Sequence, residues 1–332
     1  MADLPVPAKG KPPVYTIDLS LPPRERYTDV ATDYLPILNY MFLLFDEVVS
    51  SLKLPAFFFH FVGRVLLRRL HSSEQTEELK GISKATGLPM YLLVAYNVAL
   101  DLLMGCTSGG IMSMPLLRQA IVQLEFIERP GGDVIASTVG YVGFVGVLTG
   151  VRQDLSVSLN FRPYHDATGL SRANAQYYWN TLMVLLGRRL SISALMRDCL
   201  LPRALSHSRW RLFHSSRHAS TEPASRPPYT SADISTLLFL NADMQEVVDE
   251  SIARKACVTK DWLAFTKKQK RRARQGEEPA VGVQLEKLKE WNEEYPVCNP
   301  MTHFACVMDP REGVFRWFKC FEDEETEVQG MV

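Results

Sequence analysis

The sequence lacks several features that would assign it to a functional class at once. Its 332 residues include only six cysteines and no CxxC pair, so their spacing supports neither a dense disulfide framework nor a zinc site. The 37 basic and 37 acidic residues balance, which argues against a nucleic-acid-binding surface across the whole protein. We find no internal repeat along the chain.

Long apolar runs are also missing. The most apolar stretch, Leu54–Leu67, is too short to cross a bilayer and is interrupted by His60 and Arg64. The first residues are polar and rich in proline, with no apolar signal-peptide region, so we expect a cytoplasmic or other intracellular protein. With 46% hydrophobic and 22% charged residues, the chain has enough apolar material for a large core.

Apolar periodicity and turn residues predict both helices and strands. Strands are expected at 14–19, 120–127, 134–148, 155–161, 304–308 and 314–318, with turns at Gly150 and Pro163. Helices are expected at 35–70, divided at Leu54-Pro55, and at 77–86, 89–103, 172–186, 193–200, 247–256 and 284–291. Residues 203–233, rich in Ser, Arg, His and Pro, are expected to form a low-complexity loop.

Two segments leave alternatives open. The helix that contains Phe57–Phe61 ends in Arg68-Arg69, so it forms either a buried packing face or a lipid-facing surface. The basic run Lys267–Arg274 is either a solvated loop or helix face, or a segment for nucleic acid or nuclear import. Because this run has no interleaved aromatic residue and is followed by Glu277 and Glu278, we favour the solvated surface and expect no nucleic-acid partner.

One short motif points to a catalytic nucleophile. The helix expected at 89–103 runs into Gly105-Cys106-Thr107-Ser108 and then into strand-like sequence, a suitable place for a nucleophilic side chain. A single cysteine is more often a small buried hydrophobic residue, so the neighbouring segments decide the interpretation. These segments are Glu78–Ile82 (ELKGI), Gly87–Pro89 (GLP), Val94–Asn97 (VAYN), Val139–Gly150 (VGYVGFVGVLTG) and Leu155–Asn160 (LSVSLN).

In this order, the segments resemble the acid ceramidase family, which includes N-acylethanolamine-hydrolysing acid amidase and is grouped with the choloylglycine hydrolases among the N-terminal-nucleophile hydrolases. Tyr15–Pro23 is similar to the opening strand of that family, and Pro296–Asn299 is similar to the segment before its closing strand pair. The resemblance implies an α+β fold. The implied fold is a four-layer αββα N-terminal-nucleophile hydrolase sandwich with a helical N-terminal part, truncated in this chain in the sheet region.

Members of this family cut their own chain before the cysteine, which implies cleavage between Gly105 and Cys106. Residues 1–105 then form a helical segment like the family's α chain, and residues 106–332 a hydrolase domain like its β chain, with 203–233 as a loop. The new α-amine has an ordinary pKa of about 7.7–8.0, so it can take the proton of the Cys106 thiol as a general base. The resemblance implies no cofactor and no metal.

The implied activity is that of a ceramidase-like amidohydrolase with a cysteine nucleophile. It cleaves the N-acyl amide of ceramide or a related N-acyl lipid to a fatty acid and an amine. Asn241 corresponds to a family Asn that stabilises the oxyanion, although an ordinary turn Asn fits equally well. Asn160, Arg162 and Tyr141 are the implied substrate-binding residues, and Arg254 loosely matches a family Arg near the site.

Two departures from the family pattern keep a second interpretation open. The family carries Arg-x-x-Asp in a hairpin after Cys-Thr-Ser, whereas here only Gly110–Pro115 intervene before the matched pattern resumes. Arg118 belongs to the downstream segment and cannot simply take over. A family strand pair is replaced by residues 203–233. The alternative is a catalytically inactive family member that binds lipid or a protein partner, and a peripheral membrane contact fits either interpretation.

Overall fold

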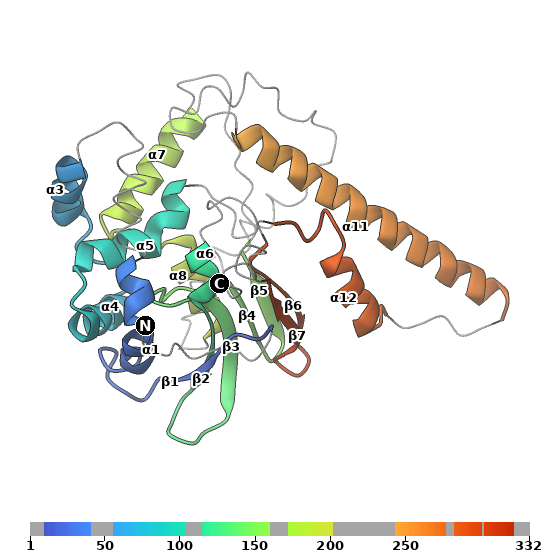
Figure 1. Ribbon diagram of the computed structural model, residues 1–332, viewed down its shortest axis with the longest axis horizontal. Helices are drawn as coiled ribbons and strands as arrows, with labels where there is room; N and C mark the ends of the chain where they lie inside the picture. The colour runs from blue at the N-terminus through green and yellow to red at the C-terminus, as the bar shows by residue number, and fades with distance from the viewer. Residues whose placement is uncertain are drawn as a thin grey trace, which may run out of the picture.

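The computed structural model of the chain describes residues 10–40, 56–103, 115–159, 172–201, 243–276, 282–300 and 302–321. These residues form a mixed α/β structure with a five-stranded sheet, a two-stranded sheet and several helices (Figure 1). The α+β class expected from the sequence is compatible with this arrangement.

The five-stranded sheet has its strands in sequence order. They are β1 (Val14–Asp18), β2 (Ile121–Ile127), β3 (Val134–Tyr141), β4 (Thr149–Arg152) and β5 (Leu155–Ser158). β1 runs parallel to β2, and all the other neighbouring strands are antiparallel. Since β1 precedes Cys106 in the chain and the other strands follow it, the segments on both sides of Cys106 build one sheet.

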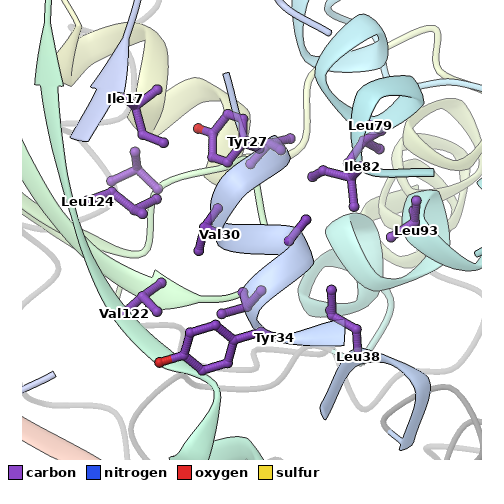
Figure 2. Close-up of a cluster of buried hydrophobic side chains, with 14 of the residues drawn as sticks. Ile17, Tyr27, Val30, Tyr34, Leu38, Leu79, Ile82, Leu93, Val122 and Leu124 are labelled. Carbon is purple, nitrogen blue, oxygen red and sulfur yellow. The ribbon is translucent and has the colours of Figure 1, made fainter. Parts of the chain in front are cut away.

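One face of this sheet carries the main core. Alternate residues of a strand point to the same side of the sheet, so the core residues of a strand are two apart. Val122, Leu124 and Phe126 of β2 are buried on this face together with Ile17 of β1. Figure 2 shows Ile17, Val122 and Leu124 near side chains of the helical layer, among them Tyr34. The helices that pack there include α1 (Thr28–Asp33), α4 (Ser73–Thr86), α5 (Met90–Leu103) and α8 (Ile192–Leu200).

Three further helices lie in the same part of the molecule. α3 (Ala56–Leu66) and α7 (Arg172–Leu185) both contact α5, and the short α6 (Pro115–Gln119) leads directly into β2 (Figure 1). α4 begins at an N-cap, where the Ser72 hydroxyl accepts a hydrogen bond from the backbone N–H of Gln75. It ends at Gly87, whose φ of 75° is the left-handed conformation that closes many helices.

The second face of the five-stranded sheet packs against the two-stranded sheet of β6 (Phe304–Asp309) and β7 (Val314–Cys320). Ile121, Val139 and Phe318 form this smaller core. The neighbouring residue Lys319 instead pairs with Glu293 of α12 (Leu285–Glu293), with 3.0 Å between nitrogen and oxygen. Because adjacent strand residues point to opposite faces, α12 lies on the outer side of β6 and β7.

The longest helix, α11 (Asp243–Arg274), extends away from the two sheets (Figure 1). It contacts α12 through Phe265, whose ring meets that of Trp291 edge to face at 6.1 Å. Within the described part of the chain, no helix combines the length and the apolar character needed to cross a membrane.

Most elements expected from the sequence are present, and three differ. The strand expected at 134–148 ends at Tyr141, because residues 142–148 form a loop in which Gly143 has a φ of 81°. The turn expected at Gly150 is wrong. Gly150 lies inside β4, where a Cβ atom would come within 2.6 Å of Leu200 Cδ2, and the chain turns at Asp154 instead. The helix expected at 247–256 is longer, since α11 spans Asp243–Arg274 and includes the basic run, for which a helix face was one of the expected forms. Phe161, Pro163 and residues 203–233 lie outside the described residues.

Candidate active site

The residues that the family resemblance assigns to chemistry fall into two groups. Five of them lie outside the described residues: Gly105, Cys106, Asn160, Arg162 and Asn241. The structure describes Tyr141, the last residue of β3, and Arg254, which is half-buried in α11. The assigned roles of all seven residues remain predictions. The structure does describe the elements on either side of Cys106, since α5 ends at Leu103 and α6 begins at Pro115.

Asn97 fixes α5 to the loop between β3 and β4, residues 142–148. Its side chain is 2% exposed, and its amide nitrogen donates hydrogen bonds to the carbonyl oxygens of Leu93 and Gly143, each at 2.9 Å. Its amide oxygen accepts a bond of 2.8 Å from the backbone N–H of Val145. A buried amide whose nitrogen and oxygen are both hydrogen-bonded fixes the positions of the two backbone segments that it joins. The C-terminal half of α5, which leads to Cys106, is therefore tied to the 142–148 loop.

α8 holds the 142–148 loop from a second side. The Arg197 guanidinium donates a hydrogen bond of 2.7 Å to the carbonyl oxygen of Val145, and the N–H of Val147 donates one of 3.1 Å to the carbonyl oxygen of Ser193. The approach is close, since a Cβ atom on Gly146 would come within 2.6 Å of Ser193 Oγ. Gly143, with its φ of 81°, and Gly146 thus serve a tight loop that packs between two helices.

Arg197 also belongs to a buried ionic triad with Glu78 of α4 and Arg26. Arg197 makes two hydrogen bonds to the Glu78 carboxylate, of 2.5 and 2.7 Å, and Arg26 makes one of 3.0 Å. Arg26 also pairs with Glu74. Burial disfavours charge on Arg197, but attraction to Glu78 outweighs it and raises the pKa of the guanidinium. Arg197 therefore stays charged, and the triad links α4 and α8 to the 142–148 loop.

Arg118 and Tyr141 connect α6 and β3 to the segments just before β6 and just after β7. Arg118 of α6 donates hydrogen bonds to the carbonyl oxygens of Pro300 and Phe321. The Tyr141 hydroxyl shares a hydrogen bond of 2.8 Å with Nδ1 of His303, which is 9% exposed. Burial, together with the nearby Cys320, raises the pKa of Tyr141, so the phenol is neutral at physiological pH. Tyr141 can act as a hydrogen-bonding group there but not as an anion.

The other cysteines differ from what a nucleophile needs. Burial raises the pKa of Cys199 to about 11 and that of Cys306 to about 12. Burial also raises the pKa of Cys257 and of Cys298. A thiol with a raised pKa carries little of the reactive thiolate at neutral pH. None of these four environments supports nucleophilic chemistry, and Cys320, the fifth cysteine in the described residues, packs against the smaller core. Cys106 is the candidate that the sequence motif indicates.

One cluster among the described residues combines groups that can ligate a metal. The thiol of Cys257 and the carboxylates of Asp261 and Glu294 have their ligand atoms within 4.8 Å of one another, where α11 meets the segment after α12. Glu294 is exposed, and exposed acidic groups of this kind are common at helix contacts. We assign no metal to it.

Comparisons with known proteins match this chain to two related enzymes. A family model described as the beta subunit of N-acylethanolamine-hydrolyzing acid amidase matches residues 10–71, which include β1, α1 and α3. N-acylethanolamine-hydrolyzing acid amidase of Caenorhabditis elegans is 29% identical over 177 residues, covering 46% of this chain and 48% of the relative. Acid ceramidase is 26% identical over 185 residues in Mus musculus and 25% over 195 residues in Homo sapiens, covering 46% of each chain in both cases.

These relatives are, by their names, amidohydrolases, and the chain described here is a mixed α/β protein with similarity to them. The resemblance to the acid ceramidase and N-acylethanolamine-hydrolysing acid amidase family, stated above from its motifs, is confirmed at modest identity over about half of the chain. The chain also spans only about half the length of the curated relatives that it matches.

His303 had no predicted role, and neither had Glu78 and Asn97, although both lie in the family-like segments. Glu78 and Asn97 each carry a signal in the sequence. Asn97 interrupts the apolar run of α5, and Glu78 precedes Leu79 and Ile82, which are both buried on the same helix. A polar residue inside an apolar helix face predicts a buried hydrogen-bonding group. The partners of these two residues could not be named from the sequence. Gly143 lies 46 residues after Asn97, and Arg197 lies 119 residues after Glu78.

Proposed function

We propose that the chain is a ceramidase-like amidohydrolase that cleaves the N-acyl amide of ceramide or a related N-acyl lipid. The observation that carries the proposal is the joint placement of the family-like segments. Glu78, Asn97 and the 142–148 loop come from three of them, and their side chains and backbones bond to one another directly or through Arg197. These bonds support α5, which precedes Cys106 in the chain.

In the proposed reaction the chain first cleaves its own Gly105–Cys106 bond. The freed α-amine of Cys106 takes the proton of the thiol, and the thiolate attacks the amide carbon of the lipid. The side-chain amide of Asn241 stabilises the oxyanion, and Tyr141, Asn160 and Arg162 bind the lipid. The amine leaves with a proton, and water then cleaves the thioester to release the fatty acid and restore the thiol.

The layers of the structure are compatible with the proposed αββα fold. An N-terminal-nucleophile sandwich packs two sheets face to face between helices, and Phe318 of β7 packs against Ile121 and Val139 of the larger sheet in that manner. Arg118 forms hydrogen bonds with two backbone carbonyls of the C-terminal segment, which supports the view that it does not replace the Arg of the Arg-x-x-Asp pair.

The exposed side chains of α3 support an apolar substrate. Phe57 is 74% exposed and Phe61 65% exposed, and α3 contacts α5. Exposed phenylalanines on a helix that contacts α5 favour the lipid-facing alternative for this segment over a wholly buried one. Arg64, whose guanidinium lies 5.5 Å from the Tyr91 ring centre, supplies a positive charge on the same helix.

The test of the proposal is self-cleavage and turnover in one set of purified proteins. Intact-mass analysis of the wild-type chain is expected to show a break between Gly105 and Cys106, and the wild type is expected to hydrolyse ceramide or an N-acylethanolamine. Cys106→Ala should abolish both. Cys306→Ser is the matched control, because its buried thiol has a pKa raised to about 12 and should not contribute to the chemistry.

An uncleaved wild type without activity on any N-acyl amide would refute the proposal and favour the inactive, lipid-binding alternative. Turnover that persists in Cys106→Ala would refute the cysteine mechanism. A folding check by circular dichroism accompanies both variants, so that loss of structure is not read as loss of chemistry.

A further inference from the structure

α11 has two different sides. On one, Cys257, Asp261 and Phe265 are half-buried, and we name these three residues the packed row. Phe265 meets Trp291 of α12, and Cys257 and Asp261 lie close to Glu294. Because helix residues three and four apart share a face, α12 and the residue after it contact one side of α11 at these turns.

The opposite side of α11 is exposed from Ile252 to Arg274. Residues at the same helical spacing form an outer row, and every one of them is exposed: Ile252, Ala256, Thr259, Leu263, Lys267, Lys270 and Arg274. Leu263 is 61% exposed and Ile252 43%, and the adjacent Trp262 is 51% exposed. Large apolar side chains that stay in water on one side of a long, protruding helix indicate an interaction surface.

Charge along the outer row changes from one end to the other. The half up to Leu263 is apolar or uncharged, whereas the half from Lys267 to Arg274 is basic. Six of the eight residues in Lys267–Arg274 are Lys or Arg, and none is acidic. Asp261, the nearest acidic residue before this run, belongs to the packed row and faces away from the outer row.

We propose that the outer row of α11 docks on an anionic membrane surface. Leu263 and Ile252 would enter the boundary between headgroups and acyl chains, while Lys267, Lys270 and Arg274 contact the anionic headgroups. Trp262 flanks the outer row beside Leu263; its ring stacks on Phe265 at 6.0 Å, and its exposed half would add apolar contact with the membrane. A helix lying in a membrane interface needs apolar groups and basic groups on one side together with a polar or protein-covered opposite side. α11 meets these conditions with its outer and packed rows.

The apolar half of the outer row favours a membrane over nucleic acid. A nucleic acid would be bound by the basic half alone, and its backbone would gain nothing from an exposed isoleucine and leucine. A membrane uses both halves at once. This docking surface lies on a different element from α3 and does not depend on the proposed hydrolysis, so its test requires no turnover.

Vesicle flotation of the full-length protein tests the proposal. Binding to phosphatidylcholine vesicles that contain phosphatidylserine is expected, with little binding to vesicles of phosphatidylcholine alone and a decline as salt is raised. The triple variant K267Q/K270Q/R274Q should bind the anionic vesicles more than about tenfold more weakly. The double variant W262S/L263S should also lose binding, because it removes the apolar groups without changing the charge.

Two control variants distinguish the outer row from the rest of the basic run and from α3. K268Q/R271Q/R272Q removes the same number of charges from the same run but outside the outer row, so it should weaken binding far less. F57S/F61S alters the exposed side of α3 and should leave α11-dependent binding intact. Thermal unfolding of every variant shows that the fold is retained.

Several outcomes would overturn the proposal. They are equal losses in the two triple variants, unchanged binding in W262S/L263S, or loss of vesicle binding in F57S/F61S alone. Binding to single-stranded RNA that depends on the basic run, without any binding to anionic vesicles, would identify the surface as a nucleic-acid site instead. An enzyme that is inactive on lipids but still binds anionic vesicles through α11 would refute only the proposed function.

Discussion

Two regions of this molecule use charge and apolar surface in opposite ways. Around Glu78, charged side chains are buried, each with a partner of opposite sign, and the buried Asn97 has both ends of its amide bonded. Along the outer row of α11, both the charged and the large apolar side chains lie in water. We name the first region the brace, consisting of Arg26, Glu78, Asn97 and Arg197 with the 142–148 loop.

The contrast separates residues that position the chain from residues that are available to partners. A buried polar group stabilises only the arrangement that satisfies it, so the brace specifies one packing of α4, α5 and α8. Exposed groups impose no such restriction. Substitutions in the brace should therefore be costly to stability, and substitutions in the outer row should be tolerated by the fold.

The largest effect is expected for Glu78→Gln. It removes the negative charge that two buried guanidinium groups share, and breaking a buried ion pair in this way costs about 3–5 kcal/mol of the free energy of unfolding. Urea denaturation measures the loss. The neighbour Glu77 is the control, since its ion pairs with Arg24 and Lys80 are partly exposed and Glu77→Gln should cost far less. Equal costs for the two variants would contradict the brace.

A smaller loss is expected for Asn97→Leu. The carbonyl of Gly143 and the N–H of Val145 would lose their buried partner, at a cost of about 2–3 kcal/mol in urea denaturation. Asn292 of α12 provides a matched control. Its amide donates only to the carbonyl of Leu288, four residues earlier on its own helix, so Asn292→Leu should cost much less. A similar cost at both positions would mean that the bonds to the 142–148 loop contribute little.

Next in size is Gly81→Ala, which tests the packing of α4 against the segment before α1. A Cβ atom at position 81 would collide with the backbone carbonyl of Arg24, and overpacking of this kind costs about 1–3 kcal/mol. Gly140→Ala in β3 is the control, because no atom lies within 4 Å of its added Cβ. Thermal unfolding of the pair should show a lower Tm for the Gly81 variant only.

The sequence predicted local features of the brace better than its long-range contacts. Periodicity and capping residues located α4, α5 and α8 within a few residues, because these signals act over one or two turns. The pairing of Glu78 with Arg197 joins residues 119 positions apart, and no local pattern encodes such a partner. Gly150 shows the same limit, since it was expected to form a turn but lies in β4 against Leu200.

The candidate site was predictable to a different extent. The motif around Cys106 gave the family resemblance, which the comparisons confirm, but Tyr141 and Arg254 are the only proposed site residues that lie in the described part of the chain. The contact of Tyr141 with His303 spans 162 residues and could not be inferred from either segment alone. Structure was predictable from the sequence where the residues that determine it lie close together in the chain.

The smallest effect is expected for Leu263→Ser in the outer row. This side chain is 61% exposed, so its replacement should change the free energy of unfolding by no more than about 0.5 kcal/mol. Leu93→Ser in α5 is the opposite case, because Leu93 is fully buried and its loss leaves a cavity and an added polar group. If urea denaturation gave Leu263→Ser a cost near that of Asn97→Leu, α11 would have to be packed on both sides in solution. The outer row would then be part of a core, and the contrast with the brace would fail together with the membrane-docking proposal.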